Sequence, residues 1–487
     1  MKIFIKLYLV AFLFVPKMSA LGGDLFPNSQ ERSLAFDVTK YVPRSIDFQG
    51  KIIKVRAYER IVYVSNPIDT SKQVINIYIP EEYFSGVSIN GFTKNTAPIF
   101  FPNRVGGYMP ADPIPFIMPE QNGPGNNRSV LFALSRGYIV ASAGARGRVS
   151  KDATGQWIGK APAVIVDLKA AVRYLKLNDG LMPGDASKII SNGTSAGGAV
   201  SALLGATGNQ SDFEPYLKAL GAASTTDDIF AVSAYCPITN LENADMAYEW
   251  QLSPIHTFDF RGKKGEISEE EIRVSQELKQ AFPAYVNHLK LKNEKGAIYS
   301  LDSEGNGNFK ELVKEYIQHS AQKALNKGVD LSSHSFLNIE NGKVQSVDFN
   351  AYMRYIGRMK TPPAFDALAN NSFENNLFGT DKMENQHFTS YSFSHSKMAT
   401  PLLADKNQIK MMNPLNYIGD KKTNVSKNWR IRHGAKDRDT GFAVPIILTT
   451  ALKNKGYSVD FALAWDKPHS GDYDLDELFD WMDQICK

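Results

Sequence analysis

Residues 189–200 read Ile-Ile-Ser-Asn-Gly-Thr-Ser-Ala-Gly-Gly-Ala-Val, and the rest of the chain is organised around them. The stretch begins with an apolar run that is typical of a buried strand and ends in small residues that favour a helix. Between the two, Gly193 to Gly197 fits the pattern G-x-S-x-G, in which a sharp strand-to-helix turn exposes a serine, here Ser195. The turn strains the backbone, so the flanking positions must be nearly free of side chain, as glycine is. We therefore expect Ser195 to be a nucleophile at a helix N-terminus, where backbone amides stabilise negative charge.

Apolar runs typical of buried strands alternate with helical segments on both sides of this stretch. Predicted strands lie at 61–64, 74–80, 97–102, 137–143, 230–238, 429–434 and 459–465, and predicted helices at 128–136, 161–177, 442–453 and 475–485. Such alternation produces a doubly wound, mostly parallel α/β sheet with helices on both faces. Residues 21–50 have a mixed composition and are expected to form loops.

The alternation stops after Ile238 and resumes after about residue 409. Amphipathic, charged helices are expected at 268–290 and 310–325 within this interval. We interpret residues 239–409 as a large, mainly helical cap domain inserted late in the core. The cap then divides the core into a first part, residues 21–238, and a second part, residues 410–487.

The chain begins with a candidate export signal. Two lysines flank the start of an apolar run at residues 7–15, and the small residues Ser19 and Ala20 follow it. This arrangement is typical of a secretory signal peptide, so we expect residues 1–20 to be removed near Ala20. The apolar run is too short to span a bilayer, and no stable membrane insertion is expected. These features predict a periplasmic or extracellular protein.

The composition is that of an ordinary globular protein. The 487 residues are 43% hydrophobic and 22% charged, and the net charge of +4 comes from mixed rather than clustered charges. Without a basic block, nucleic-acid binding is not expected. Cys236 and Cys486 lie in no metal-binding spacing, and two free thiols are favoured over a disulfide, which the sequence leaves open. The oligomeric state cannot be read from the sequence, and a monomer is favoured.

A nucleophilic serine needs a histidine as its base, and the histidine needs a carboxylate that orients it. After a G-x-S-x-G turn, the acid and then the histidine follow in the chain. Of the eight histidines, only His433 and His469 lie outside the predicted cap. His469 follows the last predicted strand, whereas His433 precedes the loop in which the acid is expected. Chain order therefore favours His469 over His433 as the base.

The acid is expected in the loop of residues 435–441, which contains Asp437 and Asp439. Either carboxylate could orient His469. The other would be free for the substrate, or could cap the helix that follows the loop. The residue pattern leaves this choice open.

Two groups of backbone amides are candidates for stabilising an oxyanion. One is the N–H of Ala196, directly after the serine. The other is an N–H in the turn at Gly106 and Gly107, because a strand followed by a Gly-Gly turn is where serine hydrolases of this kind place the second donor.

Several longer stretches resemble the bacterial tannases, or tannin acyl hydrolases, which are α/β-hydrolases that cleave galloyl esters. The most specific are Asn-Ala-Asp-Met-Ala-Tyr-Glu-Trp at 243–250 and Asp-Arg-Asp-Thr at 437–440. Further matching stretches are residues 102–110, 193–198, 234–241, 361–366, 374–379, 432–440 and 468–471. The resemblance extends over most of the chain that follows the predicted signal peptide.

The resemblance implies an α/β-hydrolase fold and galloyl ester substrates, with no metal or organic cofactor. It assigns two sets of side chains, the triad Ser195, Asp437 and His469 and a group that binds phenolic hydroxyls, Asp439, Lys360 and Glu374. The chemistry agrees, because carboxylates accept hydrogen bonds from phenols and an ammonium donates to them. Without the resemblance, Lys360 and Glu374 would be interpreted as exposed residues of the cap.

Three alternatives share part of this pattern. An esterase for feruloyl or other aromatic acids would have the same triad, but one phenolic hydroxyl would not need three polar partners. A peptidase of the same fold is less favoured, because such enzymes usually carry a long N-terminal propeller, which this sequence does not show. A catalytically idle, exported binding protein would usually have lost a member of the triad, whereas this chain has all three.

Overall fold

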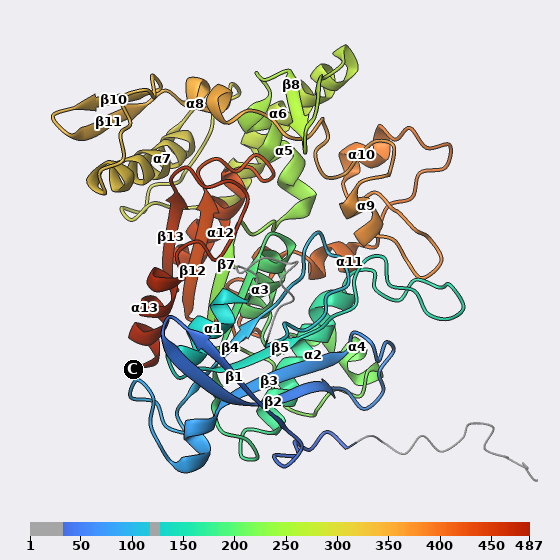
Figure 1. Cartoon of the computed structure of the whole chain (residues 1–487). Coiled ribbons are helices and arrows are strands. Elements are labelled where there is room, and N and C mark those ends of the chain that lie inside the picture. Colours follow the sequence, from blue (N-terminus) through green and yellow to red (C-terminus); the bar gives the residue numbers. More distant parts are fainter. Residues whose placement is uncertain (1–32, 117–126) are drawn as a thin grey trace, which may run out of the picture.

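A nine-stranded sheet runs through the computed structural model, which describes residues 33–116 and 127–487 (Figure 1). Its strands are β1 (Val42–Phe48), β2 (Lys51–Val62), β3 (Val74–Pro80), β4 (Pro98–Pro102), β5 (Ile139–Ala143), β6 (Asp185–Thr194), β7 (Ala231–Tyr235), β12 (Asn428–Gly434) and β13 (Ser458–Ala464). They lie in the order β1-β2-β3-β5-β4-β6-β7-β12-β13. The first three strands and β5 pair antiparallel, and every pair from β5 to β13 is parallel. The predicted α/β architecture with a mostly parallel sheet is confirmed.

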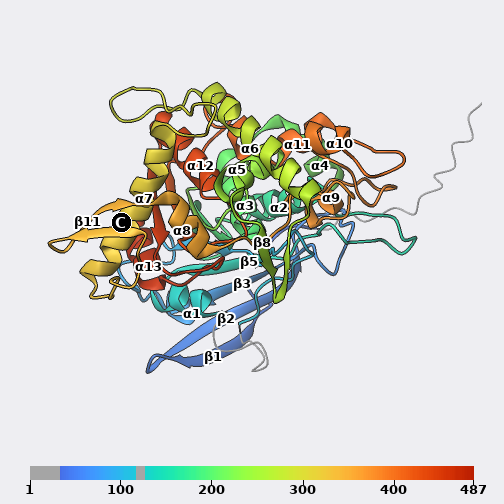
Figure 2. The same cartoon turned by 90° about the horizontal axis from the view of Figure 1, so that it is seen from above.

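Helices cover both faces of this sheet (Figure 2). One face carries α1 (Arg128–Ser135) and α13 (Leu475–Cys486), whose Phe132 and Phe479 rings stack with centroids 5.6 Å apart. The helices α2 (Ala163–Leu177), α3 (Ala196–Ala206) and α12 (Ala443–Asn454) lie on the other face, and α4 (Glu214–Ala219) packs against α2. Burial from two sides explains why the inner strands β4, β5 and β7 are fully buried and mostly apolar.

The expectation of loops throughout residues 21–50 is wrong for Val42–Phe48, which form the edge strand β1. This strand pairs antiparallel with β2, with Val42 opposite Ala57. Most of its residues are exposed. An exposed edge strand lacks the apolar alternation by which sequence reasoning finds strands, so backbone pairing alone defines it. The start of the stretch and the predicted signal peptide, residues 1–20, lie outside the described residues.

The predicted cap lies between β7 and β12 and forms the upper part of Figure 1. Its helices are α5 (Leu241–Leu252), α6 (Glu269–Leu289), α7 (Asn308–Asn326), α8 (Phe349–Ile356), α9 (Phe373–Leu377), α10 (Ser390–Ser394) and α11 (Lys406–Met411). Two hairpins that were not predicted add β8 (Thr257–Phe260) with β9 (Lys263–Glu266) and β10 (Leu337–Glu340) with β11 (Lys343–Val347). The boundary predicted at residue 409 falls inside α11.

Short 3-10 helices complete the structure at Glu81–Ser85, Ser211–Phe213 and Pro414–Asn416. Across the two described ranges, no helix is both long and apolar enough to cross a membrane. The carboxyl ends of the parallel strands β4, β6, β7, β12 and β13 meet at one edge of the sheet, which faces the cap. Loops at this edge carry the residues that are described next.

Candidate active site

Ser195 occupies the sharp turn between β6 and α3. Its backbone has φ 62° and ψ −124°, in the positive-φ region that residues with side chains rarely adopt. The Ser195 N–H donates to the Tyr235 carbonyl at 2.9 Å, which fixes the turn against the sheet. A Cβ at Gly193 or Gly197 would collide with the Asn103 side chain, so both flanking positions require glycine. The local structure is the strained turn that the G-x-S-x-G pattern predicts.

His469 and Asp437 come from the loops after β13 and β12. His469 Nδ1 donates to Asp437 Oδ2 at 2.7 Å, and the other oxygen of this buried carboxylate accepts from the N–H groups of Asp439 and Thr440 at 2.8 and 3.1 Å. Burial opposes the charge on Asp437, but the His469 and His433 imidazoles outweigh it and hold its pKa well below the usual range. Burial also opposes the charge on His469, but Asp437 outweighs it and raises the pKa of this imidazole. The pairing places the proton on Nδ1 and leaves Nε2 to act as a base.

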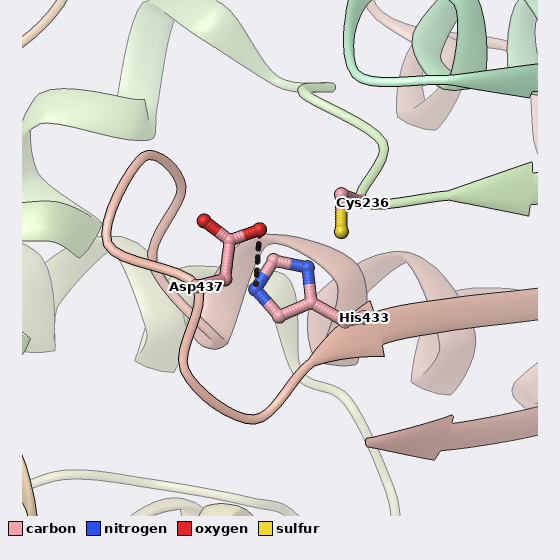
Figure 3. Close-up of side chains that lie close together, drawn as sticks. All are labelled: Cys236, His433 and Asp437. Atoms are coloured by element: carbon pink, nitrogen blue, oxygen red, sulfur yellow. Dashed lines mark ion pairs between the residues drawn. The ribbon is translucent and has the colours of Figure 1, made fainter. Parts of the chain in front are cut away.

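A second imidazole, His433, lies behind Asp437 and next to Cys236 (Figure 3). Its Nε2 is 3.2 Å from the Thr440 carbonyl and 3.5 Å from Asp437 Oδ2, while Nδ1 has no hydrogen-bond partner among residues 33–116 and 127–487. His433 is fully buried and does not line the cavity that holds Ser195. The structure therefore gives His433 no access to a proton on Ser195.

Cys236, His433 and Asp437 also have the donor types of a transition-metal site, with ligand atoms within 4.8 Å of one another. Both Asp437 oxygens already accept hydrogen bonds, so we assign no metal to this group. The absence of a metal site stays a prediction. Cys236 and Cys486 are both free and buried, and no disulfide joins them.

Ser195 and His469 line the same cavity, which has a volume of about 340 Å³. His469 Nε2 is buried and finds no hydrogen-bond partner in the part of the chain that the structure describes. It lies 3.9 Å from Asp439 Oδ1. The base nitrogen is thus unengaged at the wall of a cavity that also holds the nucleophile, which is where a reacting ester would have to lie.

Ala196, Gly107 and Tyr108 line this cavity, but Gly106 does not. The structure brings Gly107 rather than Gly106 to the cavity wall, and the place of Gly106 in the oxyanion site stays a prediction. Its carbonyl instead accepts from the Met109 N–H at 3.0 Å and closes a turn in which Gly107 and Tyr108 both have φ 54°. Gly107 and Tyr108 are the central residues of this turn, and both line the cavity.

The three residues predicted to bind hydroxyls converge on the same cavity. Lys360 Nζ from the cap lies 3.2 Å from Asp439 Oδ2 of the core, and both side chains are largely buried. Glu374, on the first turn of α9, has neither an ion pair nor a side-chain hydrogen bond within the described ranges. Burial raises the pKa of Glu374 to about 6, opposed by Lys360 and supported by Asp439. A buried carboxylate without a partner in a cavity is a group placed to accept hydrogen bonds from a ligand.

Sequence reasoning missed a further set of residues that line the cavity. These are Tyr108, Ile238, Phe260, Arg261, Ala364, Asn371, Ser372 and Phe373. Two of them, Ser372 and Phe373, directly precede Glu374 and could have been found from it. Phe260 and Arg261 lie where β8 turns into β9, a hairpin for which the sequence carried no signal.

A family model described as BD-FAE matches residues 121–284. The comparison with curated proteins gave no match. Solved structures are similar over 93% of this chain. The tannase of Fusobacterium nucleatum is 51% identical with a TM-score of 0.90, over 93% of this chain and 100% of that one.

The tannin acyl hydrolase of Lactobacillus plantarum in its native structure is 47% identical, with a TM-score of 0.90 over 93% of this chain and 99% of that one. A tannin acyl hydrolase in complex with ethyl gallate is 48% identical, with the same TM-score of 0.90 and the same coverage of 93% and 99%. Identity at this level over nearly the whole length of both chains establishes common membership. The chain belongs to the tannase (tannin acyl hydrolase) family of α/β-hydrolases and is a carboxylic ester hydrolase.

Proposed function

We propose that this protein hydrolyses galloyl esters and releases gallate through an acyl-enzyme on Ser195. The observation that carries the proposal is that Lys360, Asp439 and Glu374 line the same cavity as Ser195 and His469. A solved relative that is 48% identical is described as a complex with ethyl gallate, which supports the same substrate class for this chain.

The galloyl ring has three adjacent hydroxyls, each of which can donate one hydrogen bond and can also accept. Carboxylates at Asp439 and Glu374 accept from phenolic O–H groups, and the ammonium of Lys360 donates to phenolic oxygens or stabilises a phenolate. The 3.2 Å contact between Lys360 and Asp439 holds an ammonium and a carboxylate side by side, which supports a joint contact with neighbouring hydroxyls. A ring without hydroxyls would cover the buried Glu374 carboxylate without giving it a partner, so it would bind poorly.

In the proposed reaction, Ser195 Oγ attacks the ester carbonyl carbon while its proton passes to His469 Nε2. The N–H of Ala196 and an N–H in the Gly107–Tyr108 turn stabilise the oxyanion. The tetrahedral intermediate collapses, the C–O bond to the alcohol breaks, and His469 gives its proton to the leaving oxygen. Water then attacks the acyl-enzyme with His469 as base, and gallate leaves as Ser195 regains its proton. Asp437 holds the Nδ1–H tautomer throughout.

The test compares kcat/KM for methyl gallate, methyl ferulate and methyl benzoate, with Ser195→Ala as the control. We expect methyl gallate to exceed methyl benzoate by at least ~10²-fold, because the benzoate offers no hydroxyl to Glu374, Asp439 or Lys360. Ser195→Ala should lower kcat by ~10⁴-fold or more with the fold intact. Similar rates on all three esters would contradict the galloyl assignment, and the absence of any esterase activity would favour an idle binding protein.

We also propose that the protein acts outside the cytoplasm, as a monomer. The lysine-flanked apolar run and the small residues that follow it support export. N-terminal sequencing of protein secreted by an expression host should find a new terminus near Ala20. An uncleaved chain that stays in the cytoplasm would contradict export, and light scattering that gives a dimer mass would contradict the monomer.

A further inference from the structure

We propose that Arg148 is a positioning residue that locks the oxyanion turn at Gly107 and Tyr108 to α9, the helix that carries Glu374. It lies in the loop that follows β5, between the core and the cap. By holding the turn, Arg148 would affect the hydrolysis of any ester. By holding α9, it would affect the binding of galloyl rings, and this second role rests on the proposed function. The two roles can therefore be tested separately.

Arg148 holds both carbonyls of the oxyanion turn. Its Nε donates to the Gly107 carbonyl at 2.9 Å, and its backbone N–H donates to the Tyr108 carbonyl at 2.8 Å. The carbonyl and the N–H of one trans peptide group point in opposite directions, so a fixed Gly107 carbonyl also fixes the N–H of Tyr108. Tyr108 has φ 54°, which a residue with a side chain adopts only when its surroundings impose it. Arg148 supplies part of that constraint.

The other end of the guanidinium reaches α9. Its Nη1 donates to Asn376 Oδ1 at 3.1 Å, and its central carbon lies 4.6 Å from the centre of the Phe373 ring. Asn376 Nδ2 donates to the Glu384 carbonyl and Asn385 Oδ1 at 3.2 and 2.9 Å, which turns Oδ1 toward Arg148. Phe373 and Asn376 flank Glu374 on one short helix, so a shift of either contact moves the carboxylate in the cavity.

The loop that carries Arg148 is itself anchored to the core. Two residues earlier, Arg146 forms a buried ion pair with Asp167 on α2 at 2.8 Å. Further along the loop, Lys160 Nζ donates to the Asn376 carbonyl at 2.7 Å. The loop is thus tied to α2 at one end and to α9 at the other, and Arg148 is the residue between them that also contacts the turn.

Arginine suits this position in a way that lysine does not. A planar guanidinium can donate from Nε and Nη1 to separate acceptors while its face lies on an aromatic ring. A lysine has one nitrogen and cannot satisfy Gly107, Asn376 and Phe373 at the same time. Arg148→Lys therefore keeps the charge and approximate size but must give up at least one of the connections.

The experiment compares wild type, Arg148→Lys and Arg148→Ala on two substrates, methyl gallate and 4-nitrophenyl acetate. The acetyl ester has no ring hydroxyls in its acid part, so its kcat reports on the oxyanion turn alone. We expect Arg148→Lys and Arg148→Ala to lower kcat for the acetyl ester by about 10- to 100-fold, less than the loss of a whole oxyanion donor. With methyl gallate, kcat should fall similarly and KM should rise about tenfold, because α9 is displaced as well.

Matched variants separate the two connections. Asn376→Leu removes only the bond to α9, so it should raise KM for methyl gallate while changing kcat for the acetyl ester less than Arg148→Lys does. Arg354→Ala, an exposed arginine of the cap, serves as a control for the loss of a positive charge. Added guanidinium chloride at low millimolar concentration should restore part of the acetyl ester activity of Arg148→Ala but not of Ser195→Ala.

Three results would overturn the proposal. The first is a kcat for the acetyl ester within twofold of wild type in both Arg148 variants. The second is equal loss on both substrates without a change in KM and without guanidinium rescue, which would indicate a merely structural role. The third is an Asn376→Leu variant that lowers the acetyl ester kcat as much as Arg148→Lys. If the wild type cleaves the acetyl ester but not methyl gallate, the proposed function fails while the acetyl ester still tests Arg148 at the turn.

Discussion

Lys360 Nζ and Asp439 Oδ2 lie 3.2 Å apart across the boundary between cap and core. Lys360 follows α8 in the cap, whereas Asp439 belongs to the core loop that also supplies Asp437. The ammonium also lies 3.9 Å from the centre of the Phe365 ring, which holds it on a second side. The cap therefore contributes half of a charged pair to the cavity, and recognition depends on how the two parts of the chain meet.

The first prediction is that this pair discriminates between acids rather than drives the chemical step. Lys360→Met and Asp439→Asn should each lower kcat/KM for methyl gallate by about 10- to 100-fold, because each removes a charge-assisted hydrogen bond to the ring. The same variants should change kcat/KM for methyl benzoate by less than about threefold. Steady-state kinetics on both esters, with the double variant completing a cycle, measures the coupling between the two residues. Additive effects in that cycle would contradict a shared ligand.

The second prediction concerns the pH dependence of recognition by Glu374. Burial raises its pKa to about 6, so the carboxylate that accepts from phenolic hydroxyls exists mainly above that pH. As the pH falls from 7 to 5, we expect the ratio of kcat/KM for methyl gallate to that for methyl benzoate to drop about tenfold. The ratio cancels titration of His469, which affects both esters. In Glu374→Gln the ratio should be low and independent of pH, and a wild-type ratio that is flat over this range would contradict the assignment.

The raised pKa of Glu374 also makes the free energy of unfolding depend on pH. The folded pKa of about 6 lies above the ordinary value of 4.5, so the folded state holds the proton more tightly than the unfolded state. The stabilisation from protonated Glu374 is present below pH 4.5 and is lost as the pH rises through 6, at a cost of about 2 kcal/mol near neutral pH. Glu374→Gln should therefore raise the free energy of unfolding at pH 8 but not at pH 4. Urea unfolding at the two pH values tests this, and a loss of stability at pH 8 would contradict it.

The third prediction separates the two core histidines. His469→Ala should lower kcat for every ester by ~10⁴-fold or more, since it removes the base. His433→Asn should lower it by about tenfold, because His433 reaches the triad only through the acid, at 3.5 Å from Asp437 Oδ2. Kinetics on methyl gallate and 4-nitrophenyl acetate provide the comparison. Equal losses in the two variants would show that His433 takes part in proton transfer, for which its position gives no route.

Chain order alone could select His469 over His433, because strand order in a doubly wound sheet places the base after the acid. Chain order could not choose between Asp437 and Asp439. They lie in an irregular loop, where no periodicity indicates which way a side chain points. In the structure, Asp437 is buried against His469 and Asp439 lines the cavity.

The other differences between the site expected from the sequence and the site in the structure also arise where the chain has no periodic pattern. Gly106 and Gly107 were expected at the oxyanion site because a Gly-Gly turn follows a strand there, whereas Gly107 and Tyr108 are the turn residues that line the cavity. Tyr108, a bulky residue at φ 54°, gives no such signal in a sequence. Lys360 and Glu374 came only from the family resemblance, since Lys360 lies outside helices and strands and Glu374 lies on a five-residue helix that is too short to show a periodic pattern. The sheet was predictable because burial on two faces imposes a pattern on the sequence, and no such pattern accompanies a loop.

The last prediction concerns the buried ion pair that supports Lys360. Arg358 is fully buried and donates to both carboxylate oxygens of Glu249, at 2.9 and 2.5 Å, and to the Lys360 carbonyl at 3.2 Å. Glu249 belongs to the Asn-Ala-Asp-Met-Ala-Tyr-Glu-Trp stretch and also accepts from the Ser275 hydroxyl. We expect Glu249→Gln to lower the free energy of unfolding by ~3–5 kcal/mol, because it leaves the guanidinium buried without a counter-charge.

Urea unfolding measures this effect, and Glu270→Gln provides the control. Glu270 pairs with Lys397 at 2.8 Å on the exposed surface of the cap, so its substitution should leave stability unchanged. Replacing both buried partners, as in Glu249→Leu with Arg358→Met, should be less destabilising than Glu249→Gln alone, since no unpaired charge remains. That order of stabilities would mean that α5 is tied to the segment that carries Lys360 by the cost of leaving one charge unpaired, rather than by the net attraction of the pair. A mild effect of Glu249→Gln, similar to that of Glu270→Gln, would show that water or another group reaches Arg358 and that Lys360 is held by its contacts with Asp439 and Phe365 instead.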